Sequence, residues 1–413
     1  MAIVRPFKAV RPAREYAEEV ISLPYDVMNR KEAAEMAWDK PHSFLHICRS
    51  EIDLPQEKDP YVKAVYEKAK QNIEQWLSDK VFIQDEKPML YIYRQIMDGR
   101  AQTGIVGCVS VDDYQDDIIK KHEFTRVEKE IDRINHFDVC NSNTEPVFLT
   151  YRRDGGVDEI VNNWMESHSP EYDLKTDDGI SHILWKLDDD ALVSSLVSRF
   201  AAIPYLYIAD GHHRSASAVK VGMKRREENP DYTGQEEFNF FMAVIFPDED
   251  LKIFDYNRVV KDLNGLSSEE FLEKAAAAGF VVEEASASPY FPEAKHIFSM
   301  YLDGKWYKVT ARPEIIPDDV VKSLDVAVLQ DHLLDPVLGI KDPRTDKRID
   351  FVGGIRGLGE LERRCKEDMA LAFAVYPVEI SDLLGVADCG RVMPPKSTWF
   401  EPKLGSGLFV HRL

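Results

Sequence analysis

The chain has 413 residues, 44% of them hydrophobic and 30% charged, which is enough material for the cores of two or three domains. Its formal net charge of −21 excludes the basic footprint that non-specific binding to nucleic acid requires. An anionic ligand therefore has to bind in a local basic pocket.

Apolar runs and cysteines indicate the compartment. No run approaches the roughly 18 apolar residues of a membrane span. The N-terminus lacks the apolar stretch of a signal peptide. The five cysteines have no C-x-x-C spacing, which is typical of free thiols in a reducing environment. We therefore expect a cytoplasmic protein with no membrane partner.

Residues 1–100 are expected to form an α/β segment that packs on the core. The pattern predicts a helix from Arg30 to Trp38, a short strand over Phe44–Ile47 and a packing helix over 59–77. Strands over 89–95 and 102–111 are expected to form a hairpin.

Asp26 is expected to lie on a turn, because Pro24 biases the residue before it away from the helical conformation. A carboxylate on such a turn is a candidate general base or metal ligand. The alternative is a simple turn residue.

The segment Ile118–His136 (IIKKHEFTRVEKEIDRINH) is predicted to be one helix with a polar face. Glu123, Arg126 and Glu130 lie at positions i, i+3 and i+7, so they share that face. Charge runs of this kind usually form a solvated face laced with ion pairs. A His-Glu-x-Thr-Arg opening mixes ligand types, however, which favours a binding role.

A strand over 204–209 is followed by Asp210-Gly211 and then by a segment of small residues that suits a helix. This junction puts free backbone N–H groups and a partial positive charge at one point. His212, His213 and Arg214 add side-chain donors, which predicts an anion site, most plausibly for phosphate. The alternative is that Asp210 caps a helix and the histidines are surface residues.

The composition changes after the buried strand predicted over 240–246. A helix followed by a hairpin predicts a small α+β module over 262–315, and residues 316–413 are expected to return to the core. In the proline-rich tail, Lys396 is a candidate phosphate ligand. The alternative is a structural strap across the domain.

Asp210–Arg214 resembles the phosphate-binding turn of the ParB/sulfiredoxin superfamily, which carries a Gly-x-x-Arg element before a helix. Some members are free-serine kinases with a closely similar Asp-Gly-His-His-Arg. The chain as a whole resembles the family catalogued as domain of unknown function 1015. The segments that carry this second resemblance are Leu23–Val27, His122–Arg133, Asp210–Arg214 and Met393–Thr398.

The resemblance implies a mixed α/β fold in which residues 101–261 form a ParB/sulfiredoxin-like core around a central mixed sheet. It also implies a phosphotransferase that uses ATP or ADP with Mg²⁺. The best-guess acceptor is free L-serine, which would give O-phosphoserine. The expected partners are thus an amino acid and a nucleotide, without nucleic acid or membrane. Oligomeric state stays open, a homodimer included.

The resemblance also implies roles for particular residues. Glu123, Asp26 and His213 are expected to be catalytic, with Asp26 or Glu123 accepting the hydroxyl proton, and Glu123 with Glu130 is expected to hold the metal. The expected nucleotide- and phosphate-binding residues are Asp210, Gly211, His212, His213, Arg214, Arg126, Lys129, Arg133 and Lys396.

Two other functions remain open from the sequence. One is a nucleotide-binding switch or hydrolase that has no acceptor. The other is a metal-dependent hydrolase built on His122, His212 and His213, although no H-x-x-x-H or H-x-H spacing supports it.

Overall fold

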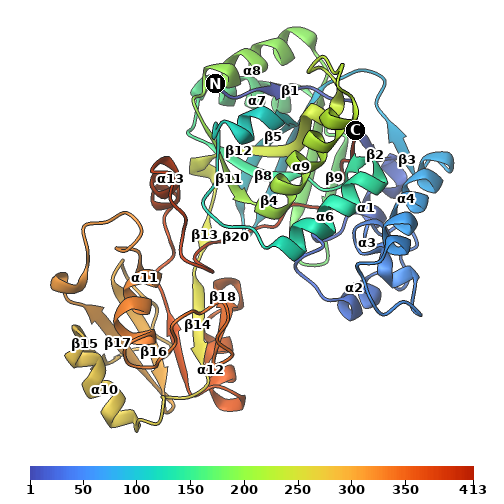
Figure 1. The fold of residues 1–413 in the computed structure, drawn as a ribbon. Coiled ribbons are helices and arrows are strands. Elements are labelled where there is room, and N and C mark those ends of the chain that lie inside the picture. The colour runs from blue at the N-terminus through green and yellow to red at the C-terminus, as the bar shows by residue number, and fades with distance from the viewer. The chain divides into compact units, whose positions relative to one another are not determined.

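The structure, a computed structural model, describes all 413 residues and divides into two units (Figure 1). The first unit comprises Met1–Leu251 together with Pro402–Leu413. The second comprises Lys252–Glu401. The C-terminal segment 402–413 therefore belongs to the same unit as the N-terminus.

A nine-stranded sheet forms the centre of the first unit, in the order β6-β11-β8-β12-β5-β4-β10-β9, with β1 paired to β5. The pairs β11·β6 and β12·β8 are parallel and the others antiparallel, so the predicted central mixed sheet is confirmed. The strands are β1 (Val4–Arg5), β4 (Leu90–Met97), β5 (Arg100–Ser110), β6 (Ile119–Lys120), β8 (Val147–Tyr151), β9 (Tyr172–Lys175), β10 (Ser181–Leu187), β11 (Leu206–Asp210) and β12 (Phe240–Pro247).

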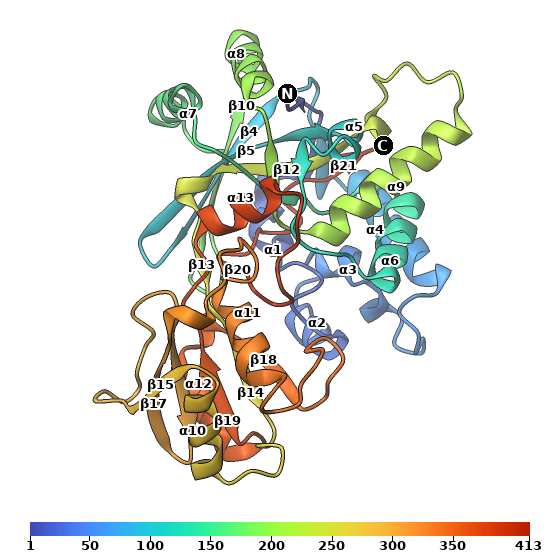
Figure 2. The same ribbon diagram turned by 60° about the vertical axis from the view of Figure 1, so that its left-hand side comes forward.

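Nine helices accompany this sheet. They are α1 (Ala17–Val20), α2 (Arg30–Met36), α3 (Leu45–Cys48), α4 (Lys63–Ser78), α5 (Val111–Gln115), α6 (Val127–Cys140), α7 (Gly155–Ser167), α8 (Asp190–Ala202) and α9 (His212–Glu228). Helix α6 contacts both α4 and α9, so it connects the N-terminal helices to the helix that follows β11 (Figure 2).

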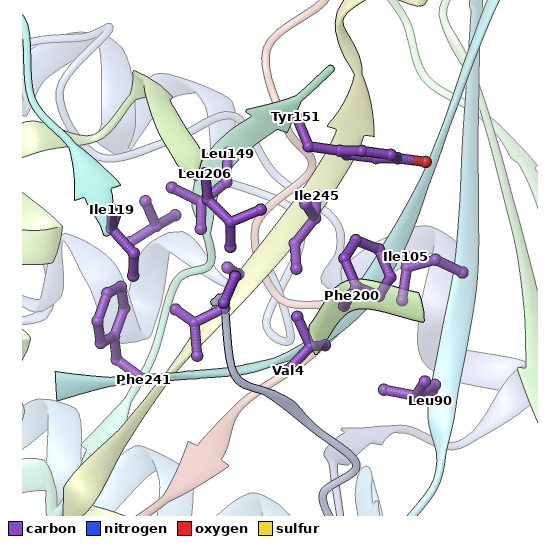
Figure 3. Packing of buried hydrophobic residues seen from close by; sticks show 14 of the residues in the cluster. Val4, Leu90, Ile105, Ile119, Leu149, Tyr151, Phe200, Leu206, Phe241 and Ile245 are labelled. Atoms are coloured by element: carbon purple, nitrogen blue, oxygen red, sulfur yellow. The ribbon is translucent and has the colours of Figure 1, made fainter. Parts of the chain in front are cut away.

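The main core of the first unit forms because alternate strand residues point to one face of the sheet. Leu149, Ile245 and Ile105 are cross-strand neighbours in β8, β12 and β5, and each is at most 1% exposed (Figure 3). Phe200 of α8 packs against the same cluster. This packing fixes β8 and β11, and the polar residues described below include Glu145, which precedes β8, and Asp210, which ends β11.

Two small ribbons tie the chain ends to the first unit. Strand β2 (Val10–Pro12) pairs with β3 (Phe82–Gln84), and β21 (His411–Arg412) pairs with β7 (Ser142–Asn143). Backbone bridges also join Ser22 to Ser406 and Val10 to Val410. The last residues of the chain are thereby fixed beside the start of β8.

The second unit contains a six-stranded antiparallel sheet in the order β15-β17-β16-β19-β14-β18 and a two-stranded ribbon, β13·β20. The strands are β13 (Ile253–Phe254), β14 (Tyr256–Val260), β15 (Phe280–Glu284), β16 (Ile297–Leu302), β17 (Lys305–Ala311), β18 (Ile349–Gly353), β19 (Leu371–Ala374) and β20 (Trp399–Phe400). The helices are α10 (Ser268–Ala277), α11 (Asp325–Leu329), α12 (Leu358–Glu367) and α13 (Ile380–Asp388).

The unit boundaries differ from those expected from the sequence. The hairpin β16·β17 was expected to complete a module at residue 315, but β18 and β19 pair with β14 and β16 in the same sheet. The second unit therefore begins before 262, extends to 401, and leaves only 402–413 in the first unit.

Two predicted elements differ in kind. Phe44–Ile47 is not a strand, because Leu45–Cys48 forms α3. A four-residue segment with three apolar residues is too short for its periodicity to separate a strand from a buried helical turn. The predicted helix 118–136 begins only at Val127, after β6 and a loop, and Arg126 is its N-cap. Glu128 and Glu130 fall in its first turn, where negative charge is favourable.

No helix in the structure has both the length and the apolar character needed to cross a membrane.

Candidate functional site

The turn between β11 and α9 depends on Gly211. Its φ of +91° lies in the left-handed region, and a Cβ there would come within 3.0 Å of Arg214 Nε. Gly211 is the N-cap of α9, and no side chain caps the helix. The alternative in which Asp210 caps α9 is therefore wrong, and the first-turn N–H groups keep their affinity for an anion.

Asp210 is held ionised at the end of β11. Its carboxylate accepts the Gly211 N–H at 2.8 Å and a hydrogen bond from Lys403 Nζ at 3.2 Å. Burial raises the pKa of Asp210, but the charges of Lys403 and Arg214 more than offset this and hold it well below its ordinary value. Lys403 comes from the C-terminal segment, a role that the sequence pattern did not predict.

Arg214 lies beneath the turn and is only 2% exposed. Its Nη1 donates to the Pro146 carbonyl at 2.6 Å, and its Nε has no hydrogen-bond partner. A phosphate contact by Arg214 stays a prediction. The side chain supports the turn and brings a buried positive charge to it.

His122 and His212 form a buried pair, with ring centroids 4.4 Å apart and nearly perpendicular rings. The His122 N–H donates to His212 Nε2 at 3.4 Å. Burial lowers the pKa of His122 to about 4 and holds that of His212 well below its ordinary value. Both rings are thus neutral at neutral pH, and they contribute polar atoms to the site without contributing charge.

His213 faces the loop that precedes α6. Its Nε2 accepts the backbone N–H of Arg126 at 3.0 Å, and burial lowers the pKa of the ring. Glu123, on the same loop, lies 3.7 Å (Oε2) from His212 Nδ1. The structure thus brings the His122–Arg126 loop and the Asp210–Arg214 turn together, although they are some eighty positions apart in sequence.

Glu130, in the first turn of α6, is bound to other side chains of the protein. Its carboxylate accepts from the Thr125 hydroxyl and pairs with Lys220, and despite burial these contacts lower its pKa. Both contacts occupy the Glu130 carboxylate, and magnesium binding by Glu123 with Glu130 stays a prediction. No group of three or more His, Cys, Asp or Glu side chains has a metal-binding arrangement, the His122, His212 and His213 set included.

Arg133 and Glu145 extend the site into the interior. Arg133 Nε donates to Asp132 at 3.0 Å, and its Nη1 lies 3.7 Å from Glu145 Oε2. The Glu145 carboxylate accepts the Tyr25 N–H at 3.2 Å and the Ser406 hydroxyl at 2.9 Å, and burial raises its pKa. Sequence reasoning missed Glu145, although an acidic residue at the start of an apolar strand was a usable signal.

Asp26 is exposed and directly follows Tyr25, whose ring lies 4.0 Å from the Arg133 guanidinium. The Asp26 charge acts on both Arg214 and His213, in each case raising the pKa against the effect of burial. Asp26 therefore lies within electrostatic reach of the turn, as its predicted role requires.

Lys129 and Lys396 were both expected to bind phosphate, and each has neighbours other than the turn in its own unit. Lys129 Nζ lies 3.5 Å from the Tyr61 hydroxyl and lines a separate cavity of about 260 Å³. Lys396 belongs to the second unit, where its Nζ lies 5.2 Å from the centre of the Tyr256 ring. A phosphate contact by Lys396 stays a prediction.

Comparisons with known proteins give a family and remote structural likenesses. A family model described as "Protein of unknown function (DUF1015)" matches residues 4–327. No curated protein matches the chain. Among solved structures, a free serine kinase in complex with AMP is 15% identical, with a TM-score of 0.35 over 74% of this chain and 92% of that one. SbnI from Staphylococcus aureus, with a C-terminal truncation, is 11% identical, with a TM-score of 0.41 over 74% and 87%.

Proposed function

The chain belongs to the DUF1015 family of proteins of unknown function, as its sequence motifs predicted, and we propose that it transfers a phosphoryl group from a nucleotide to a small alcohol. One observation carries the proposal. The uncapped N-terminus of α9, the buried charges behind it and the Asp26 carboxylate converge from three separate segments of the chain. Phosphoryl transfer needs such positioning and charge neutralisation more than it needs covalent catalysis.

The first-turn N–H groups of α9 and the helix dipole bind the transferred phosphoryl group in this proposal. Arg214 is buried directly behind Gly211, so its charge adds to the field at the turn without leaving the interior. The neutral His212 and His122 rings shield the turn from water. Arg126, which is exposed at the start of α6, is the cation best placed to meet the outer phosphates.

Asp26 is the proposed general base. The acceptor hydroxyl oxygen forms a bond to the terminal phosphorus, the bond from that phosphorus to the bridging oxygen breaks, and the shortened nucleotide leaves with the electron pair. The hydroxyl proton passes to Asp26. Glu123 was the alternative base, and its position 3.7 Å from His212 Nδ1 favours a role in orienting that imidazole.

Magnesium would supply further charge neutralisation when bound with the nucleotide. Because Glu130 is paired with Lys220 and Thr125, only Glu123 of the predicted pair fits this role, together with phosphate oxygens. The phosphoryl binding and the proton transfer described above use groups of the protein itself.

The proposed acceptor is free L-serine, since the Asp210–Arg214 motif is closely similar to that of free-serine kinases. The test is incubation of the purified protein with L-serine, magnesium and either ATP or ADP, with O-phosphoserine detected by phosphorus NMR. We expect phosphoserine to accumulate with one of the two nucleotides. Nucleotide hydrolysis that is independent of any acceptor would support the switch or hydrolase alternative instead, and the absence of nucleotide binding would overturn both.

A further inference from the structure

A second polar feature of the first unit is a cavity of about 260 Å³ lined by residues of α4, α6 and the segment 28–51. Four basic and two acidic side chains line it: Arg30, Arg49, Lys129, Arg133, Glu51 and Asp132. In a chain with a net charge of −21, this local excess of positive charge favours an anionic group in the cavity.

Three buried polar atoms on the cavity wall lack hydrogen-bond partners. They are Arg49 Nε, Arg133 Nη1 and His136 Nε2, and the residues Arg133 and His136 are 4% and 1% exposed. A buried guanidinium N–H without a partner is destabilising, and a bound acceptor would remove that cost. Arg30 differs, because its Nη1 and Nη2 donate to backbone carbonyls of 51–57. The guanidinium donors available to a ligand therefore gather at Arg49 and Arg133.

The two acids give the cavity a negative side as well. Asp132 accepts from the Tyr66 hydroxyl and from Arg133 Nε, each at 3.0 Å. Glu51 lies 2.9 Å from Arg49 Nε. A ligand with a carboxylate alone would compete with these acids for Arg49 and Arg133, whereas one that also carries an ammonium group offers the acids a new partner. The volume lies just below the range of about 300–1,000 Å³ typical of drug-sized ligands, which suits a small zwitterion better than a nucleotide.

The cavity borders the residue that precedes the proposed base. Arg133 stacks on the Tyr25 ring at 4.0 Å, and Arg49 Nη1 donates to the Tyr25 carbonyl at 3.4 Å. Both arginines line the cavity. A ligand held by them would therefore be bound by side chains that contact Tyr25, the residue before Asp26, whose charge also acts on His213 and Arg214.

We propose that this cavity binds the phosphoryl acceptor as a zwitterionic α-amino acid. Arg133 and Arg49 bind its carboxylate, and Asp132 and Glu51 bind its ammonium group. The identification of this ligand as the acceptor rests on the proposed function, whereas the binding site itself does not.

Isothermal titration calorimetry without nucleotide tests the binding site. The probes are L-serine, 2-aminoethanol, which lacks the carboxylate, and 3-hydroxypropionate, which lacks the ammonium group. We expect each analogue, and also Arg49→Met with L-serine, to bind at least about tenfold more weakly than wild type with L-serine. Arg94→Met is the matched control, because Arg94 lines a different cavity of about 220 Å³, and its affinity for L-serine should not change.

Circular dichroism establishes that Arg49→Met folds, and Lys129→Met provides a second variant of the same wall, with the same direction of effect. Equal affinity of wild type and both variants, equal binding of the analogues, or no binding of any amino acid would overturn the proposal. A loss of nucleotide affinity in Arg49→Met with unchanged affinity for serine would also overturn it.

The outcomes separate this proposal from the proposed function. Serine binding that depends on Arg49, without formation of phosphoserine, would refute the kinase and retain the site. Formation of phosphoserine with the same KM for serine in Arg49→Met would retain the kinase and refute the site.

Discussion

The two ends of β8 carry the same kinds of charged residue in opposite environments. After its last residue, Arg153 pairs with Asp158 at 2.6 Å and with Asp250 at 3.1 Å, and the arginine side chain is 34% exposed. Before its first residue, Glu145 and Arg214 are almost completely buried, and each has a polar atom without a partner. Exposed ion pairs that satisfy one another are typical of a structural role, whereas incompletely paired buried charges are costly and mark functional sites.

The two ends of β8 do not differ much in the size of the cavity nearby. The cavity near Arg153 measures about 220 Å³ and the one near Arg133 about 260 Å³. The charges around the first cancel, since Arg94 and Arg153 face Asp158 and Asp250. The difference therefore lies in whether the lining groups are already paired, and the following predictions compare variants at the two ends.

The largest difference is expected in catalysis. Asp26→Asn should lower kcat for serine phosphorylation by about 10²–10⁴-fold, because the amide cannot accept the hydroxyl proton. Asp158→Asn, at the other end of β8, should leave kcat unchanged. Steady-state rates with nucleotide affinity measured in parallel test this pair. A kcat for Asp26→Asn close to that of wild type would exclude Asp26 as the base and direct attention to Glu123.

Arginine replacement should separate the two ends in stability. Arg214→Lys should lower the free energy of unfolding by about 3–5 kcal/mol, because a lysine in its place breaks a buried hydrogen-bonded ion network. Arg153→Lys should lower it by less than about 1 kcal/mol, because the pair is exposed to solvent. Urea denaturation of both variants provides the measurement. Equal losses would show that burial at the turn has no special cost.

Local patterns in the sequence were sufficient to predict much of the fold. The capping box of Asn29 and Glu32 starts α2 where a helix was predicted, and the apolar runs around Leu149 and Ile245 form β8 and β12. These elements have signals within a few residues. The extent of the second unit was not predictable in this way, because β19 pairs with β14 and β16, and the paired residues are at least 69 positions apart in sequence.

The site was predictable in its membership and much less in its chemistry. The motif identified the Gly211 turn and the loop around Glu123, which lie together. Burial could not be read from the motif, however, and burial makes His212 neutral and hides Arg214. Lys403 could not be assigned from its neighbours, because it reaches Asp210 through tertiary structure. Glu145 had a local signal, but its partners Tyr25 and Ser406 come from distant parts of the chain.

Acidification should destabilise the protein through the buried histidines. The folded state lowers the pKa of His122 to about 4, so it favours the neutral ring. This contribution is complete above the ordinary pKa of about 6.5 and is lost as the pH falls toward 4, by about 3 kcal/mol at most. His212, whose pKa is also lowered, should likewise reduce stability as the pH falls. Glu145, whose pKa burial raises, should act in the opposite direction and increase stability as the pH falls.

The measurement is the urea midpoint between neutral pH and pH of about 4 for wild type and His122→Asn. The variant lacks one titrating group, so its midpoint should change less over this interval. Parallel curves for the two proteins would show that His122 does not carry the pH dependence.

The smallest effect is expected at Lys403, and its control is an ion pair of the same length. Lys403 lies 3.2 Å from Asp210, with side chains 15% and 32% exposed, and Lys87 lies 3.2 Å from Asp190, with side chains 48% and 89% exposed. Lys403→Met should lower the free energy of unfolding by about 1 kcal/mol at neutral pH, and Lys87→Met by a few tenths at most.

Asp210 has a lowered pKa, so its stabilising contribution is present above the ordinary aspartate pKa and is lost as the pH falls through the folded value. The difference between Lys403→Met and wild type should therefore shrink on acidification below pH of about 4, which urea titrations at two pH values can measure. A loss that is equal for both lysine variants, or one that does not depend on pH, would mean that Lys403 holds the C-terminal segment in place without acting on the charge of Asp210.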